Sequence, residues 1–279
     1  MDIVLEEKIV SMMSDLRRTL RKKKIRYKNL KEFNQSIIFS IRNKSNNELT
    51  LDTLKKYSED FVISFENNIF KLRFSEKGLD KIVQTTMQQA IEIVRRRIDE
   101  SGTKEPLIQR QGKDRILVQL PGIDDPERIK RLLGKTAKLT FRFTHPKILS
   151  SELTANSNVP PGYVLLKDQK IKDKLYLIQK KVMISGESLT DARPGFDQDG
   201  NSAVMFTLTT SGGKKFGKIT GKNIGKAFAI ILDGQVISAP IIQGQIYSNG
   251  QITGNFSIQE ANDLALVLRA GALPVPLLI

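Results

Sequence analysis

The sequence predicts an α+β fold, because the same order of elements occurs twice along the chain. Residues 79–143 read as a helix, two strands, a second helix and a third strand, and residues 3–66 repeat that order. One further strand placed before each set would complete a βαββαβ unit, which is the ferredoxin-like arrangement. We therefore expect a ferredoxin-like base that is duplicated at the N-terminus, with a mainly-β α+β head domain inserted into it.

The later unit is predicted to begin with a helix over residues 79–101. Gly102 follows it, where a left-handed C-terminal cap is expected. The residues at helical spacing are Leu79, Ile82, Val83, Thr86, Ala90, Ile93, Val94 and Ile98.

The remaining elements of this unit are a hairpin, a short helix and a closing strand. Residues 107–111 and 116–120 are extended runs joined by a glycine-containing turn. Asp125 is a helix N-cap with proline directly after it. Residues 139–143 alternate between apolar and polar side chains, which indicates a strand with one buried face.

The earlier unit is predicted to open with an amphipathic helix over residues 3–23. Strands are expected at 25–30, 35–42, 61–65 and 69–74, and a helix at 49–57. Asn67 and Asn68 form the turn before the last strand, because asparagine tolerates positive φ. We expect residues 69–74 to serve as the first strand of the later unit, and the first strand of the earlier unit to lie upstream of Met1.

The head is predicted between residues 146 and 253. A polar, proline-containing stretch follows Pro146, and short strands come after it, with Asp233-Gly234 as a hairpin turn. A capping box at Ser257–Glu260 then begins a last helix. We expect this helix to cover a sheet made by residues 116–120 and 139–143. The predicted domains are therefore 1–68, a base of 69–145 with 254–279, and a head of 146–253.

The composition limits the function classes. A net charge of +15 indicates a negatively charged partner, and the absence of cysteine excludes disulfides and thiolate metal sites. No apolar run approaches the roughly 20 residues of a membrane helix, so we expect a soluble fragment. A basic segment spans Arg17 to Lys31. It is either a solvated helix end or a patch that lies on phospholipid head groups.

No catalytic, cofactor or metal site is predicted, and we expect no enzyme. Gly212–Lys218 matches a phosphate loop, but Ile219 stands where Ser or Thr must hold magnesium, so a nucleotide hydrolase is a weaker alternative. Asp197 begins a run like a calcium loop, but Leu208 stands at the twelfth position, where a glutamate is required. His145 is the only histidine and lacks evident catalytic partners.

A second alternative is an RNA-binding ferredoxin-like module, which the predicted topology and the charge favour. Such a module stacks bases on aromatic side chains of its central strands. The run 116–120 contains no aromatic residue. We therefore expect no nucleic-acid partner.

Three long blocks of the sequence carry a resemblance to a known family. Residues 88–143, 223–246 and 262–277 resemble the first periplasmic domain of SecD, an accessory subunit of the bacterial Sec protein-export translocase. Residues 1–75 are similar to the longer N-terminal insert of some SecD chains, and residues 146–200 match weakly.

The resemblance implies a fold, partners and a location. SecD domains of this kind have a ferredoxin-like base and a head that holds emerging polypeptide and swings. The implied partners are unfolded preprotein, SecF and the SecYEG channel. The fragment would lie on the periplasmic side of the bacterial inner membrane, with membrane contact through segments absent from this sequence. The family uses the proton motive force through carboxylates in those absent segments.

Two groups of site residues follow from the resemblance. The hinge between base and head is expected at Phe143, Thr144, His145, Pro146, Thr253, Gly254, Asn255 and Phe256. Preprotein is expected to contact apolar residues of the head, namely Phe206, Leu208, Phe228, Ile230, Ile241 and Ile246. The alternative for these six residues is that they form the core of the head.

Overall fold

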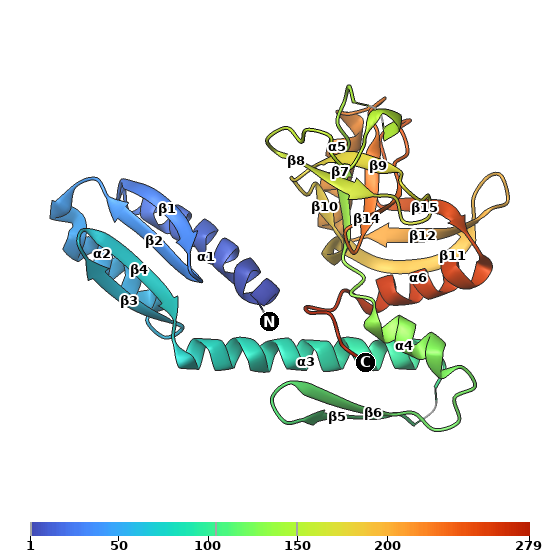
Figure 1. Ribbon diagram of the computed structural model, residues 1–279, viewed down its shortest axis with the longest axis horizontal. Helices are drawn as coiled ribbons and strands as arrows, with labels where there is room; N and C mark the ends of the chain where they lie inside the picture. The colour runs from blue at the N-terminus through green and yellow to red at the C-terminus, as the bar shows by residue number, and fades with distance from the viewer. Residues whose placement is uncertain (1, 104, 149) are drawn as a thin grey trace. The chain divides into compact units, whose positions relative to one another are not determined.

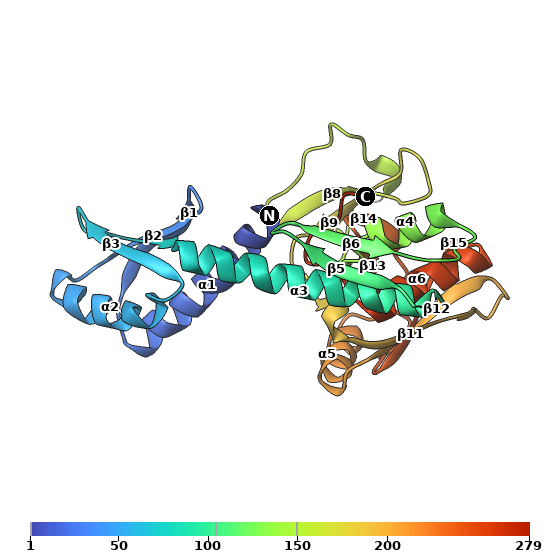
Figure 2. The ribbon, with the colours of Figure 1, turned by 90° about the horizontal axis from the view of Figure 1, so that it is seen from below.

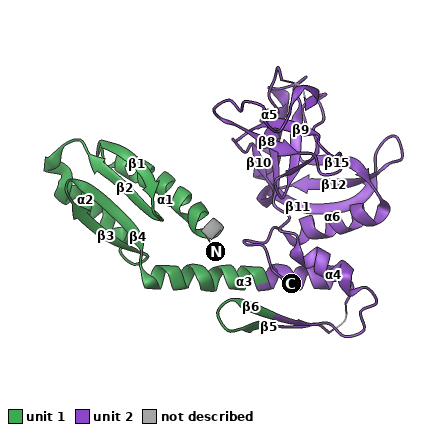
Figure 3. Cartoon of the chain, viewed as in Figure 1, with its two compact units in different colours: residues 1–90, 110–116 green, residues 91–109, 117–279 purple. Residues whose placement is uncertain are grey.

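The structure is a computed structural model that describes residues 2–103, 105–148 and 150–279. The chain forms two compact units (Figure 3). Unit 1 comprises residues 1–90 with 110–116, and unit 2 comprises residues 91–109 with 117–279. Helix α3 (Glu76–Glu100) contributes its first part to unit 1 and its last part to unit 2.

Unit 1 contains a four-stranded antiparallel sheet with two helices on one face (Figures 1 and 2). The strand order is β1-β2-β4-β3, and every neighbouring pair is antiparallel. The elements are α1 (Asp2–Lys22), β1 (Tyr27–Phe33), β2 (Ser36–Ile41), a 3-10 turn (Lys44–Asn46), α2 (Asn47–Leu54), a second 3-10 turn (Lys55–Tyr57), β3 (Phe61–Glu66) and β4 (Ile69–Phe74).

The core of unit 1 follows from side-chain alternation in the strands. Phe70, Leu72 and Phe74 of β4 are buried, while the residues between them are exposed. The ring of Phe39 on β2 stacks on Phe70, with ring centroids 5.1 Å apart. Leu16 and Leu20 of α1 and Leu54 of α2 belong to the same core. Burial of these side chains is what holds both helices on one face of the sheet.

The place of strand β4 in the sheet differs from the expected topology. The turn at Asn67 and Asn68 is confirmed, since both residues have positive φ, of 49° and 65°. However, residues 69–74 do not begin a later unit, because β4 pairs with both β2 and β3. It occupies the place that the first strand takes in a ferredoxin-like sheet. Unit 1 is thus a circularly permuted form of that arrangement, with the first strand supplied last.

Unit 2 contains the end of α3 and the remaining elements. They are β5 (Leu107–Gln111), β6 (Arg115–Gln119), α4 (Pro126–Gly134), β7 (Leu139–Phe143), a 3-10 turn (Ser150–Glu152), β8 (Tyr163–Lys167), β9 (Leu175–Gln179), β10 (Ile184–Ser185), a 3-10 turn (Gly186–Ser188), β11 (Leu189–Phe196), β12 (Ser202–Leu208), α5 (Thr210–Gly221), β13 (Phe228–Leu232), β14 (Gln235–Ser238), β15 (Asn249–Phe256) and α6 (Ile258–Ala270). The tip of the β5–β6 hairpin is grouped with unit 1.

Two antiparallel sheets meet in the core of unit 2. One has the order β10-β7-β13-β14 and the other β11-β12-β15, while β5–β6 and β8–β9 form separate two-stranded sheets. Phe141 of the first sheet contacts Phe206 of the second, with ring centroids 5.5 Å apart. Phe216 of α5 and Phe228 of β13 complete this aromatic cluster. These rings pack the two sheets and α5 together.

The ferredoxin-like base expected in this part of the chain is not formed, so the duplication is not confirmed. Strand β7 pairs with β10 and β13 and not with the hairpin. All five residues of β13 are buried, so β7 pairs with a strand that is shielded from water. The residues of β6, in contrast, are at most partly buried.

The expected position of the last helix is also wrong. Helix α6 packs against β11, β12 and β15 and not against a sheet of residues 116–120 and 139–143. Strand β7 and helix α6, both assigned to the base from the sequence, therefore belong to the same packed body as the strands between them.

Candidate functional site

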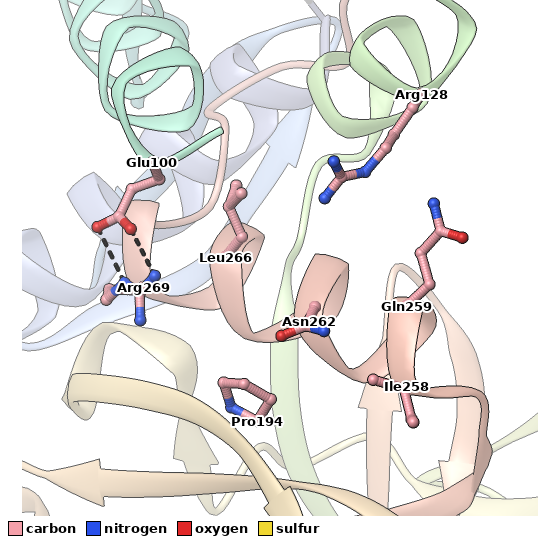
Figure 4. A pocket seen from close by; sticks show the side chains of 8 residues that line it. All are labelled: Glu100, Arg128, Pro194, Ile258, Gln259, Asn262, Leu266 and Arg269. Carbon is pink, nitrogen blue, oxygen red and sulfur yellow. Dashed lines mark hydrogen bonds and ion pairs between the residues drawn. The ribbon is translucent and has the colours of Figure 1, made fainter. Parts of the chain in front are cut away.

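A surface cleft lies along α6 in unit 2. Its volume is about 520 Å³. Figure 4 shows the side chains that line it, which come from four elements. They are Glu100 at the end of α3, Arg128 of α4, Pro194 of β11, and Ile258, Gln259, Asn262, Leu266 and Arg269 of α6.

Helix α6 presents this lining because its two faces differ. Its buried stripe of Leu264, Val267 and Leu268 packs inward. The capping box between Ser257 and Glu260 fixes its first turn, as the sequence predicted. The face toward the cleft carries amides and one exposed aliphatic side chain, Ile258, which is 65% exposed.

Two arginine–carboxylate pairs join α6 to the helices across the cleft. Nε and Nη2 of Arg269 donate to the carboxylate of Glu100, with a distance of 2.9 Å from Nε to Oε1. Arg128 donates to Asp263 Oδ1 from Nε at 3.0 Å and from Nη2 at 2.7 Å. These side chains keep partial contact with water, so each pair contributes only about 1 kcal/mol or less.

A third arginine makes a buried connection between the same elements. Arg97 of α3 is only 1% exposed. It donates to the carbonyls of Leu132 and Leu133 in the last turn of α4, and to that of Lys135 directly after the helix. It also donates to Gly271, the residue that follows α6, at 3.0 Å. The C-terminal ends of α4 and α6 thus share one cation. A cation is favoured there because the last carbonyls of a helix lack partners within the helix and the helix dipole is negative at that end.

The electrostatics of Arg97 are governed by its burial. Desolvation lowers its pKa to about 10, and the carboxylate of Asp233 acts in the opposite direction. That pKa is still well above neutrality, so the guanidinium is charged and all these carbonyl contacts are available at physiological pH.

The predicted hinge residues lie in hydrogen-bonded strands. Phe143 is buried and pairs with Phe228, Thr144 bridges to Ile178, and the His145 amide donates to the Leu177 carbonyl at 2.7 Å. Pro146 follows them and is exposed. On the other side, Thr253, Gly254, Asn255 and Phe256 lie in β15, where the register with β12 shifts and Asn255 has a φ of 51°. Bending at either place has to break strand pairing, and the hinge stays a prediction.

The six predicted preprotein contacts fall into two groups. Phe206, Leu208, Phe228 and Ile230 are buried in the core of unit 2. Ile241 is 55% exposed and Ile246 is partly buried, and both lie in the irregular segment before β15. Only these last two side chains are available to a partner without unfolding. Neither of them lines the cleft.

The candidate motifs for chemistry prove to be structural. Gly212–Lys218 lies inside α5, where a Cβ on Gly213 or Gly217 would stand within 3.0 Å of Ser248 or Tyr247. The glycines therefore allow close packing and do not cradle a phosphate. Asp197 Oδ1 accepts from the amides of Asp199 and Asn201, as in a turn.

No metal site is seen in the part of the chain that the structure describes. In those residues, no group of three or more His, Cys, Asp or Glu side chains could hold a metal. His145 Nδ1 accepts from the amides of Lys147 and Ile148, so it closes a turn. None of the described helices has both the length and the apolar character of a membrane span.

The sequence reasoning missed the residues that line and bridge the cleft. A signal existed for Arg97, which falls between Val94 and Ile98 on the apolar stripe of α3 and so had to be buried. No comparable signal marks Glu100, Arg128 or Asp263, because exposed charges on helices are common.

Comparisons with known proteins match both parts of unit 2. The profile "SecDF, P1 head subdomain" matches residues 163–275, and the profile "Protein translocase subunit SecDF, P1 domain, N-terminal" matches residues 87–146. The cleft lies between these two parts. Glu100 and Arg128 come from the N-terminal part, and Pro194 and the α6 residues come from the head.

Individual relatives agree with this assignment. Protein translocase subunit SecD of Rickettsia prowazekii is 43% identical over 281 residues, which cover 100% of this chain and 54% of the relative. SecD of Rhodobacter capsulatus is 48% identical over 216 residues, or 77% of this chain and 38% of the relative. The chain thus spans about half the length of the Rickettsia relative and 38% of the Rhodobacter relative.

A solved structure extends the match to the fold. The structure titled "Structure and function of a membrane component SecDF that enhances protein export" is 36% identical, with a TM-score of 0.55. The match covers 69% of this chain and 90% of that one. Because both profiles, the relatives and the fold agree, the chain belongs to the SecD family of protein translocase subunits and carries both parts of its P1 domain.

Proposed function

We propose that this chain is the periplasmic part of a SecD-type subunit that binds unfolded preprotein transiently and assists its export through movement of the head. It carries out no catalysis of its own. Its partners are preprotein, SecF and the SecYEG channel, and coupling to the proton motive force belongs to membrane segments outside this stretch. The observation that supports this proposal is the cleft along α6, which is open and lies between the two P1 parts.

The cleft lining suits polypeptide segments of varied sequence. Ile258 and Pro194 offer apolar contact, and Gln259 and Asn262 carry amides that can donate to or accept from an extended backbone. Neither kind of contact requires a particular side chain on the partner. Binding of this kind is sequence-tolerant and weak, as a transient role requires.

The ion pairs across the cleft and the buried hydrogen bonds of Arg97 support a rocking movement of the head. The Arg269–Glu100 and Arg128–Asp263 pairs are partly exposed, so water can replace their contacts at little cost. Arg97 is buried at the C-terminal end of α6 and would remain engaged. We therefore place the pivot of the proposed movement at Arg97 and Gly271, with the N-terminal end of α6 moving further.

An NMR titration with a permanently unfolded polypeptide tests the proposal. Carboxymethylated α-lactalbumin is added to the labelled chain, and amide shifts are mapped. We expect shifts near Pro194 and along α6, with smaller ones around Ile241 and Ile246. Shifts confined to residues 1–75, or none at millimolar polypeptide, would refute binding by the head.

A further inference from the structure

Unit 1 has a sheet face that helices α1 and α2 leave uncovered. Helices α1 and α2 lie on one side of the strands (Figure 2), and the other side presents alternate residues of all four strands. Cross-strand pairing places Phe33, Ser36, Arg73 and Val62 in one row, and Lys31, Ile38, Lys71 and Ser64 in the next. Lys28 and Ser40, and Ile69 and Glu66, are the pairs that follow. We call these residues the outer sheet face.

The outer sheet face is strongly cationic. Lys28, Lys31, Lys71 and Arg73 are all exposed, and Glu66 is its one carboxylate. Among the described residues, none of these four cations lies within ion-pair distance of a carboxylate. Since neighbouring strands are about 4.8 Å apart, Lys31 and Lys71 stand about 10 Å from each other. A flat anionic surface can meet both at once.

Large apolar side chains stand among these cations. Phe33 is 54% exposed, and Val62 and Ile69 are exposed to a similar extent. A solvated sheet face normally carries polar residues at such positions. Exposed aliphatic and aromatic groups beside lysines and arginines are the pattern of surfaces that enter the boundary between lipid head groups and acyl chains.

The structure also divides the basic segment that the sequence analysis singled out. Lys28 and Lys31 lie on the outer sheet face, whereas Arg17 and Arg21 lie on α1, the helix that packs on the opposite face. The two basic groups therefore lie on opposite sides of the sheet. Only the group on the sheet is accompanied by exposed apolar side chains from the neighbouring strands.

We propose that the outer sheet face docks on an anionic phospholipid surface. Its cations would contact the head groups, and Phe33, Val62 and Ile69 would enter the interface. RNA is a poorer match, because the central strands β2 and β4 present Ile38, Lys71 and Arg73 on this face and no ring on which bases could stack. This proposal is independent of polypeptide binding by unit 2.

A tryptophan reporter tests the proposal directly, because the chain contains no tryptophan. Phe33→Trp places a probe on the outer sheet face, and Val10→Trp, at a site 58% exposed on α1, is the matched control. Vesicles of phosphatidylglycerol with phosphatidylcholine should shift the emission of the Phe33→Trp chain to the blue, while pure phosphatidylcholine should not. A shift only in the control would overturn the assignment of the face.

Charge variants separate specific docking from general attraction. K71Q/R73Q and R17Q/R21Q remove the same charge from opposite sides of unit 1. Each lysine or arginine near a charged membrane changes affinity about fivefold, so K71Q/R73Q should weaken vesicle binding about 25-fold. R17Q/R21Q should change it less than twofold. Equal losses of vesicle affinity in the two variants would overturn the proposal. So would a competition experiment in which single-stranded RNA displaces the chain from the vesicles at a lower concentration than added phosphatidylglycerol does.

Discussion

Arg97 on α3 donates to the carbonyl of Gly271 over 3.0 Å, across 174 positions of sequence. The same guanidinium caps the C-terminal end of α4. One buried side chain therefore joins the N-terminal part of the P1 domain to the last helix of the head.

Arg97→Leu should destabilise unit 2 by about 3 kcal/mol, because buried carbonyls of α4 and Gly271 lose their donor. Urea unfolding followed by circular dichroism measures the change. Arg96→Leu is the matched control, since Arg96 is exposed and, among the described residues, forms an ion pair with Glu92 in the preceding turn, so less than about 0.5 kcal/mol is expected. Equal unfolding midpoints for the two variants would show that Arg97 does not tie the helices together.

Gly250→Ala should destabilise unit 2 by about 1–3 kcal/mol through overpacking. A Cβ at this position would stand 2.4 Å from Cζ of Phe206, whose ring is held among Phe141 and Phe216. Gly244→Ala provides the comparison, because a Cβ there meets nothing within 4 Å and the backbone requires no positive φ. Thermal unfolding measures the stability of both variants. We expect a lower unfolding temperature for Gly250→Ala and an unchanged one for Gly244→Ala. A neutral Gly250→Ala would mean that the Phe206 ring has room to move.

The Arg269–Glu100 pair should show a measurable but small coupling. A double-mutant cycle with Arg269→Gln and Glu100→Gln is expected to give about 0.5–1 kcal/mol, as both groups keep contact with water. The coupling should fall in high salt. A coupling of several kcal/mol would contradict the proposal that the ion pairs across the cleft break at little cost.

Stability should depend on pH through Glu260. The hydrogen bonds from Lys170 and from the Ser257 amide hold the pKa of Glu260 below its ordinary value of 4.5. Because the folded state binds this proton more weakly, the stabilisation is present above pH 4.5 and is lost as the pH falls through the lower folded pKa. Glu260→Gln should therefore unfold more easily than the parent chain at pH 7, by less than about 1 kcal/mol, and the difference should shrink as the pH falls below 4.5. A constant difference between pH 3 and pH 7 would exclude this titration.

Local features of the fold could be predicted from the sequence, whereas strand partners could not. The cap at Asp125, the capping box at Ser257 and the turn at Asn67-Asn68 depend on neighbouring residues, and all three are confirmed. The partner of β7 depends on β13, which lies far along the chain and is buried throughout. Alternation alone shows that residues 139–143 form a strand, but it does not show which strand lies beside it.

The candidate site shows the same limit. Arg97 could have been singled out as a charge on an apolar stripe, but its acceptors are backbone carbonyls, which every residue supplies. The pairing of Arg269 with Glu100 joins two surface charges that have many possible partners in a chain of this composition. Four of the six predicted preprotein contacts proved to be core, because apolar alternation marks burial and not binding.

The most direct test of the proposed function is the affinity of unfolded polypeptide for a chain altered at the cleft. Ile258→Arg changes the apolar side chain at the cleft, and Ile171→Arg adds the same charge at a site that is also exposed but does not line it. Fluorescence anisotropy of labelled carboxymethylated α-lactalbumin should show at least about tenfold weaker binding to Ile258→Arg, since a charge replaces the apolar contact. Binding to Ile171→Arg should match that of the parent chain. Equal affinities for all three chains would contradict polypeptide binding along α6.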